Sequence, residues 1–141
     1  MEALRLENQL CFPLYVCAKE VVRRYHPLLE PLGLTYTQYI AMMAFWEHKS
    51  LTVGQLGGLL HLDSGTLTPM LKKMEKCGWI RRERSRTDER QTIATITPDG
   101  DALRERAAEV PHQMMQCALL DSDEAVQLYT LLYKLIDRIT K

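Results

Sequence analysis

The most constraining feature of the sequence is a pair of short helical segments joined by a tight turn, with a hairpin pattern directly after them. Thr52 and Gln55 have the spacing of a helix-capping box, and a short apolar segment follows them. The turn after that segment holds Asp63 and Ser64, either of which can cap a second helix. Gly78 stands where a C-terminal glycine is expected. This pattern predicts a helix-turn-helix arrangement.

A two-stranded hairpin with a charged tip is predicted directly after the second helix. Trp79 and Ile80 are aromatic or β-branched, and residues 92–97 alternate in the same way beyond a polar stretch at 84–91. A β-ribbon that follows a helix-turn-helix is a wing. The sequence therefore predicts a winged helix-turn-helix.

Longer helices are predicted before this region. Apolar residues recur at steps of three and four over residues 10–29, which is the period of an amphipathic helix. Pro13 either opens the main part of this helix or kinks it, because proline removes a backbone donor. Pro31 and Gly33 end the helix, and a second one with its own capping box is expected over residues 35–48.

Two further helices are predicted after the hairpin. Thr97 and Pro98 form an N-cap with proline at the first helical position of a helix that ends near Cys117, and Pro111 is a place where this helix can be altered. Residues 121–124 cap a last helix with an apolar stripe through Ile139. Apolar residues therefore gather near both ends of the chain, where a small domain usually frays. We expect something to cover these ends in a mainly α protein with a small β-wing.

Composition limits where this protein works. At 141 residues and 46% hydrophobic, the chain fits one compact domain. No run has the apolar length of a membrane span, and the N-terminus lacks the basic-then-apolar order of a signal peptide. We therefore expect a soluble, cytoplasmic protein that makes no membrane contact.

Charge is unevenly distributed, although the formal net charge is zero. The segment from Lys72 to Arg90 has an excess of cations, namely Lys72, Lys73, Lys76, Arg81, Arg82, Arg84, Arg86 and Arg90. Its acidic residues are Glu75, Glu83, Asp88 and Glu89. Such a segment is either a solvated face or a surface for the phosphates of nucleic acid.

The start of the second helix of the pair favours DNA. Its residues are small or carry hydroxyl groups, namely Ser64, Gly65, Thr66, Thr68 and Pro69. Lys72 and Lys73 follow one turn later. A recognition helix meets base edges through its N-terminal residues, and small side chains let its backbone approach the major groove. The alternative for Ser64 alone is simple helix capping, but the lysines and the wing favour DNA.

The hairpin tip offers a second DNA contact. Arg86 and Arg90 can enter a narrow minor groove, whose negative potential attracts guanidinium groups. The alternative is that exposed arginines only keep the hairpin soluble. Asp88 can instead pair with one of these arginines and hold the wing.

The four cysteines, Cys11, Cys17, Cys77 and Cys117, form no C-x-x-C pair and have no histidine at zinc-ligand spacing. We predict no metal site and no cofactor. Each cysteine is then a small buried hydrophobe or a reactive thiol. Cys17 and Cys77 lie on apolar stripes and are interpreted as structural, and the apolar neighbours of Cys11 alone favour the same interpretation.

The helix-turn-helix, the Asp88-x-Arg90 motif and the long terminal helices resemble MarR-type regulators over nearly the full length of the chain. Three segments are also similar to the OhrR-type organic-hydroperoxide sensors of that family: residues 6–12, LENQLCF, residues 25–36, YHPLLEPLGLTY, and residues 62–69, LDSGTLTP.

The resemblance implies a homodimer that binds a pseudo-palindromic DNA operator. Residues 1–141 would form a single MarR-type winged-helix domain. Residues 1–33 and 98–141 would supply intertwined dimerisation helices, and residues 34–97 the winged helix-turn-helix, DNA-binding portion. Intertwined ends would also explain the apolar residues near both termini.

The resemblance also assigns the sensing residues. The thiol matching Cys11 is oxidised by an organic hydroperoxide, and the tyrosines matching Tyr25 and Tyr36 hydrogen-bond it across the dimer interface. Phenol donors and a nearby helix N-terminus favour the thiolate, which is the nucleophile. Tyr15, one turn after Cys11, is a further candidate for lining this pocket. Cys117 either resolves oxidised Cys11 through a disulfide or packs in the dimer core.

Two other functions stay open on the sequence alone. One is a MarR-type repressor that a small phenolic or drug-like ligand releases from DNA without cysteine chemistry. The other is a thiol peroxidase, although the chain offers no cofactor site and no motif for docking a reductase, so no catalytic residue is predicted.

Overall fold

A computed structural model describes residues 1–116 and 119–140 of the chain. They divide into two compact units, Met1–Val110 and Pro111–Lys141. Cys117, the candidate resolving cysteine, lies outside the described residues. No helix in the described part of the chain is long and apolar enough to cross a membrane.

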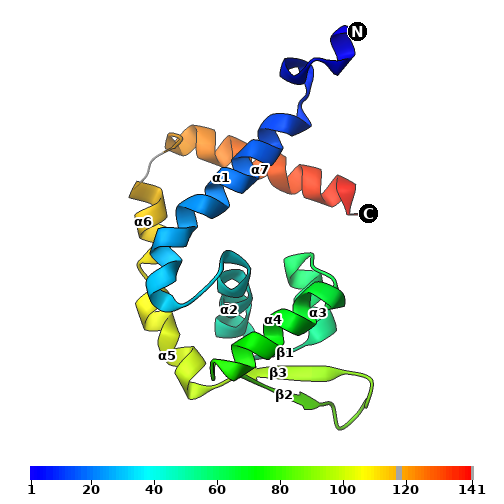
Figure 1. Ribbon diagram of the computed structural model, residues 1–141, viewed down its shortest axis with the longest axis vertical. Coiled ribbons are helices and arrows are strands. Elements are labelled where there is room, and N and C mark those ends of the chain that lie inside the picture. The colour runs from blue at the N-terminus through cyan, green and yellow to red at the C-terminus, as the bar shows by residue number, and fades with distance from the viewer. Residues whose placement is uncertain (117–118, 141) are drawn as a thin grey trace. The chain divides into compact units, whose positions relative to one another are not determined.

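The first unit contains the winged helix-turn-helix (Figure 1). Its elements in chain order are the 3₁₀ turns η1 (Glu2–Leu4) and η2 (Leu6–Asn8), α1 (Cys11–Leu29), η3 (Glu30–Leu32), α2 (Tyr36–His48), β1 (Ser50–Thr52), α3 (Val53–Leu60), α4 (Ser64–Lys76), β2 (Ile80–Arg84), β3 (Thr92–Ile96) and α5 (Pro98–Ala107). Helix α6 (Val110–Gln116) begins at the boundary, and α7 (Ser122–Ile139) lies in the second unit.

The predicted helix starts are confirmed by side-chain caps. Thr35 and Thr52 each form a capping box with the glutamine three residues later. Of the two candidates for α4, Asp63 is the cap, because its carboxylate accepts the Thr66 N–H at 2.7 Å. Thr97 caps α5 and Asp121 caps α7, also as predicted.

The two proline questions have different outcomes. Pro13 opens α1 instead of kinking it, because it is the third residue of the helix, where the backbone nitrogen needs no intrahelical partner. The helix predicted from Pro98 toward residue 117 is divided into α5 and α6. Pro111 is the second residue of α6, a position in the first turn that suits proline.

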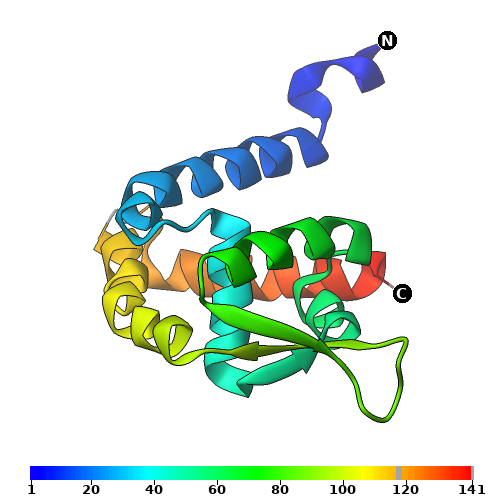
Figure 2. The same ribbon diagram turned by 60° about the horizontal axis from the view of Figure 1, so that its bottom comes forward.

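The sheet has three antiparallel strands in the order β1-β3-β2, one strand more than the predicted hairpin. β3 pairs with β2 through Arg82 opposite Ala94, and with β1 through Leu51 opposite Ala94. β1 has only three residues, and the last of them, Thr52, is also the cap of α3, so the sequence gives no periodic signal for this strand. Figure 2 shows the β2–β3 hairpin running beside α4, with its long loop projecting from the sheet.

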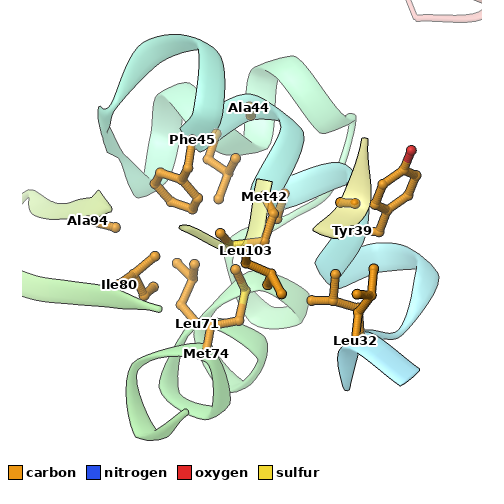
Figure 3. Packing of buried hydrophobic residues seen from close by; sticks show 14 of the residues in the cluster. Leu32, Tyr39, Met42, Ala44, Phe45, Leu71, Met74, Ile80, Ala94 and Leu103 are labelled. Carbon is orange, nitrogen blue, oxygen red and sulfur yellow. The ribbon is translucent and has the colours of Figure 1, made fainter. Parts of the chain in front are cut away.

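The core of the first unit joins the helices to the base of the wing (Figure 3). Its largest fully buried side chains are Phe45, Leu29, Met42, Leu56, Leu67, Leu71, Met74 and Ile80. Gly100 lets α5 approach the turn before β2, because a Cβ at this position would overlap the Trp79 carbonyl oxygen. The indole Nε1 of Trp46 donates to the Gly100 carbonyl at 2.9 Å and fixes α2 against the same segment.

Candidate DNA interface and thiol site

The turn between α3 and α4 is packed closely enough to hold the two helices as one unit. A Cβ at Gly57 would lie 2.7 Å from the Leu62 carbonyl oxygen and 3.3 Å from the Leu67 side chain. His61 caps α3 in the left-handed conformation at φ 55°, which reverses the chain before Asp63. The glycine therefore permits the helix-turn-helix geometry, although sequence analysis did not single it out.

Helix α4 presents the predicted DNA-contact residues on its outer side. Leu67, Leu71 and Met74 are fully buried and anchor its inner face. The exposed residues are Ser64, Gly65, Thr66, Pro69, Lys72 and Lys73, and Thr68 is half-buried. The small residues at the start of α4 and the two lysines therefore lie outside the core, where a recognition helix needs its DNA-contacting residues.

The wing is ordered by hydrogen bonds within its loop. The buried Ser85 hydroxyl accepts the N–H of Thr87 at 3.2 Å and of Asp88 at 3.3 Å. Asp88 then accepts the backbone N–H of Arg90 at 3.1 Å and its Nε at 3.2 Å. Asp88 therefore pairs with Arg90, and this pairing leaves the Arg90 side chain 91% exposed. Arg86 is also exposed at the tip.

Helix and wing residues meet around one surface hollow of about 380 Å³. Its lining includes the predicted Ser64, Thr68 and Arg90, together with the starts of α3 and β3, namely Thr52, Val53, Gly54, Gln91 and Thr92. Hydroxyl, amide and guanidinium groups at such a place are donors suited to phosphate oxygens. Sequence analysis missed Thr52 and Gln91 here because one acts as a helix cap and the other ends a charged loop.

Cys11 is the first residue of α1 and is exposed. Tyr25 follows fourteen positions later on the same helix, which separates the two residues by about 21 Å along the helix axis at 1.5 Å per residue. Cys11 and Tyr25 of one chain therefore cannot touch. A contact between them requires a second chain.

The two predicted tyrosines lie together, and a third joins them. The ring centroids of Tyr25 and Tyr36 are 4.8 Å apart, and Tyr39 lies 5.8 Å from Tyr25 and 6.3 Å from Tyr36. Burial, and then the neighbouring Tyr25, raise the pKa of Tyr36 and of Tyr39, so both phenols stay protonated donors at neutral pH.

Tyr39 was missed by sequence analysis, although its place three residues after Tyr36 puts both on one side of α2. It is only 3% exposed, and in Figure 3 its hydroxyl points away from the other labelled core residues. Tyr15 does not join the cluster through any contact within the described chain. Tyr15 is 63% exposed, and the centroid of its ring lies 5.7 Å from the Lys19 Nζ.

The other described cysteines are not buried within a single chain. Cys17 is exposed on α1, and Cys77 is exposed just after the last residue of α4. The interpretation of Cys77 as a core thiol is wrong, because the helix ends before it and turns at Gly78, whose φ is 82°.

Each unit leaves large apolar side chains in solvent. In the first unit these include Leu4, Leu6, Leu10, Phe12, Leu14, Val21 and Val22, and in the second Val126, Leu128, Leu131, Leu135 and Ile139. Apolar surface on this scale is typical of protein interaction sites.

Comparison with known proteins identifies the family. Residues 23–106 match the model of the transcriptional regulator SarA/Rot family. The chain is also 45% identical over 136 residues to the organic hydroperoxide resistance transcriptional regulator of Bacillus subtilis, covering 96% of this chain and 92% of the relative. The chain belongs to the MarR/SarA family of transcriptional regulators.

Solved structures of similar proteins share the fold. Reduced AbfR bound to DNA is 36% identical with a TM-score of 0.81, over 99% of this chain and 98% of that one. AbfR in a disulfide form is 34% identical with a TM-score of 0.68, over 99% and 96%. The reduced form of MarR from Escherichia coli is 27% identical with a TM-score of 0.73, over 90% and 96%.

The family membership confirms three predictions. The fold is a MarR-type winged helix-turn-helix, mainly helical with an antiparallel wing. The protein is a DNA-binding transcriptional regulator. It is not an enzyme, which removes the thiol peroxidase hypothesis.

Proposed function

We propose that this regulator is a cytoplasmic homodimeric repressor that senses organic hydroperoxides through oxidation of Cys11 and then releases a pseudo-palindromic operator. The observation that carries the proposal is the exposed Cys11 thiol at the N-terminus of α1, in a chain 45% identical to a regulator of organic hydroperoxide resistance. The thiolate is the form of a cysteine side chain that attacks a peroxide.

The dimer is part of this proposal and is supported by two observations. The apolar side chains exposed on α1 and α7 need cover, and helices of a second copy would supply it. Cys11 is also too far along α1 from Tyr25 of its own chain for a hydrogen bond. Residues 1–33 and 98–141 would then be dimerisation helices, with residues 34–97 left to bind DNA.

The chemistry needs only the thiolate and the peroxide. The Cys11 sulfur attacks the outer peroxide oxygen, the O–O bond breaks, and the departing alkoxide takes a proton to leave as an alcohol. Cys11 is oxidised to a sulfenic acid and the hydroperoxide is reduced. The hydroxyls of Tyr36 and Tyr25 of the partner subunit would donate hydrogen bonds to the thiolate, with Tyr15 lining the same pocket.

Resolution of the sulfenic acid requires a second thiol. Attack by that thiol on the Cys11 sulfur forms a disulfide and releases water. Either Cys117 of the partner subunit or a small cellular thiol can act, and the disulfide form of AbfR supports a protein thiol. The sulfenic acid is larger and more polar than a thiol, and a disulfide requires its two sulfurs to be bonded, so either product would disturb a packed interface and move the two recognition helices relative to each other.

Chemical trapping tests the sensing residue. The protein is treated with one equivalent of cumene hydroperoxide and then with a reagent specific for sulfenic acids, and the modified residues are located by mass spectrometry. We expect the label on Cys11. Cys77, which is exposed and lies outside the proposed dimerisation helices, is the internal control for simple accessibility. Equal labelling of Cys11 and Cys77 would mean that Cys11 has no special reactivity.

The remaining alternative is a repressor that a small phenolic or drug-like ligand releases from DNA. It makes a different prediction for one variant. Cys11→Ser would leave release intact if a ligand binds without cysteine chemistry, whereas the redox proposal requires that this variant stay on DNA in the presence of peroxide.

A further inference from the structure

Glu75 and Arg82 form a pair that links the last turn of α4 to the middle of β2. The backbone N–H of Arg82 donates to Glu75 Oε2 at 2.8 Å. The Arg82 guanidinium donates to Oε1 of the same carboxylate through Nε at 3.2 Å and Nη2 at 3.1 Å. Both carboxylate oxygens are therefore used, and the guanidinium fork fixes the geometry as well as the charge.

The pair also closes the edge of the wing. β2 is an edge strand, and the N–H of Arg82 bonds Glu75 instead of β3. An edge-strand N–H normally bonds water, so the carboxylate replaces a mobile partner with one anchored on α4. The bonds from Arg82 lower the pKa of Glu75 and keep it ionised at neutral pH.

Arg82 is less exposed than the candidate DNA contacts of its segment. Its side chain is 23% exposed, whereas Lys72, Arg86 and Arg90 are exposed. To bind a phosphate, the Arg82 guanidinium would have to leave the Glu75 carboxylate, and Glu75 would then lose its partner. Arg82 therefore directs its guanidinium at Glu75, although it belongs to the basic segment.

The position of the pair suggests what it controls. α4 carries the exposed lysines, the wing loop carries the exposed arginines, and only residues 77–79 connect α4 to β2. Gly78 in this connection has a φ of 82°, and Trp79 N–H bonds the Met74 carbonyl at 3.1 Å. If the angle between α4 and the wing is already fixed in the free protein, DNA binding loses no free energy in ordering these two elements.

We propose that Glu75 and Arg82 are positioning residues that set the angle between the recognition helix and the wing for DNA binding, and that Arg82 itself contacts no phosphate. The inference rests on DNA binding by the family and is independent of whether Cys11 is the sensor. Loss of the pair weakens binding through geometry, while the number of neutralised phosphates stays the same.

The salt dependence of DNA affinity separates these two roles. Affinity is measured by fluorescence anisotropy on a duplex selected from random-sequence DNA by the parent protein, over about 50–200 mM salt. For Arg82→Ala and Glu75→Gln we expect affinity to fall on the order of tenfold at each salt concentration. The slope of log affinity against log salt should stay as in the parent.

Two further variants make the test sharp. Arg82→Lys keeps the charge but loses the fork, so it should bind as weakly as Arg82→Ala, with each protein shown to be folded at the assay temperature. The double variant Glu75→Gln with Arg82→Ala should bind no more weakly than Arg82→Ala alone, because both changes break one interaction.

Three results would overturn the inference. A slope reduced by about 1 in Arg82→Ala, with affinity restored in Arg82→Lys, would identify Arg82 as a phosphate contact. Additive losses in the double variant would show that the two residues act separately. Parent-like affinity in folded Arg82→Ala would show that the pair has no role in DNA binding.

Discussion

Replacement of Gly57 and of its neighbour Gly58 by alanine should change stability in opposite directions. Both residues lie in α3, and alanine is favoured over glycine in a helix interior by about 1 kcal/mol. At Gly58 no heavy atom lies within 4 Å of the added Cβ. Gly58→Ala should therefore keep most of that gain, about 0.5–1 kcal/mol.

At Gly57 the same gain is opposed by a clash. The added Cβ would lie 2.7 Å from the Leu62 carbonyl oxygen, which belongs to the backbone of the turn and cannot rotate away. Overpacking of this kind costs about 1–3 kcal/mol, so Gly57→Ala should be less stable than Gly58→Ala by about that amount.

The two variants are compared by thermal unfolding at one protein concentration, since assembly would raise apparent stability. For a chain of this size the difference corresponds to about 3–10 °C in Tm. If Gly57→Ala melts at the same temperature as Gly58→Ala or above it, Gly57 does not lie as close to the Leu62 carbonyl as the structure has it.

Three further predictions concern single groups. Tyr36→Phe should slow the oxidation of Cys11 by hydroperoxide, because a hydrogen-bond donor to the thiolate is lost; equal oxidation rates in variant and parent would exclude this role. The lowered pKa of Glu75 means that its contribution to stability is complete above its unfolded value of about 4.5 and is lost as pH falls through the folded value. Glu75→Gln should thus flatten the acid limb of a stability curve, and an unchanged limb would contradict the Arg82 pairing. Peroxide should produce a covalent dimer on non-reducing gels that disappears in both Cys11→Ser and Cys117→Ser, and a dimer that persists in the second variant would remove Cys117 from the mechanism.

Much of the winged helix-turn-helix could be predicted because its signals are local. A capping box depends on residues three apart, and the caps at Thr35, Thr52 and Asp121 are observed where the sequence placed them. Strand β1 was missed because three residues carry no period. The sequence predicted one helix where the structure has α5 and α6. Pro111 showed that this helix could be altered, but it did not show that a new helix begins at Val110.

The sites were less predictable, because they depend on residues distant in sequence. The small and basic residues of α4 could be recognised from their order, but the pairing of Glu75 with Arg82 depends on how a turn folds back. Tyr39 has the appearance of a core aromatic in the sequence, and only the ring distances place it beside Tyr25 and Tyr36. The exposure of Cys77 depends on where α4 stops.

The most direct test of the proposed function is release of operator DNA during a titration with cumene hydroperoxide, followed by fluorescence anisotropy. The parent protein and Cys17→Ser, which removes an exposed thiol six positions further along α1, should both release DNA as peroxide is added. Cys11→Ser should bind the operator with parent affinity and stay bound throughout the titration. Release by Cys11→Ser at the same peroxide concentration as the parent, or retention of DNA by fully oxidised parent protein, would contradict sensing through Cys11.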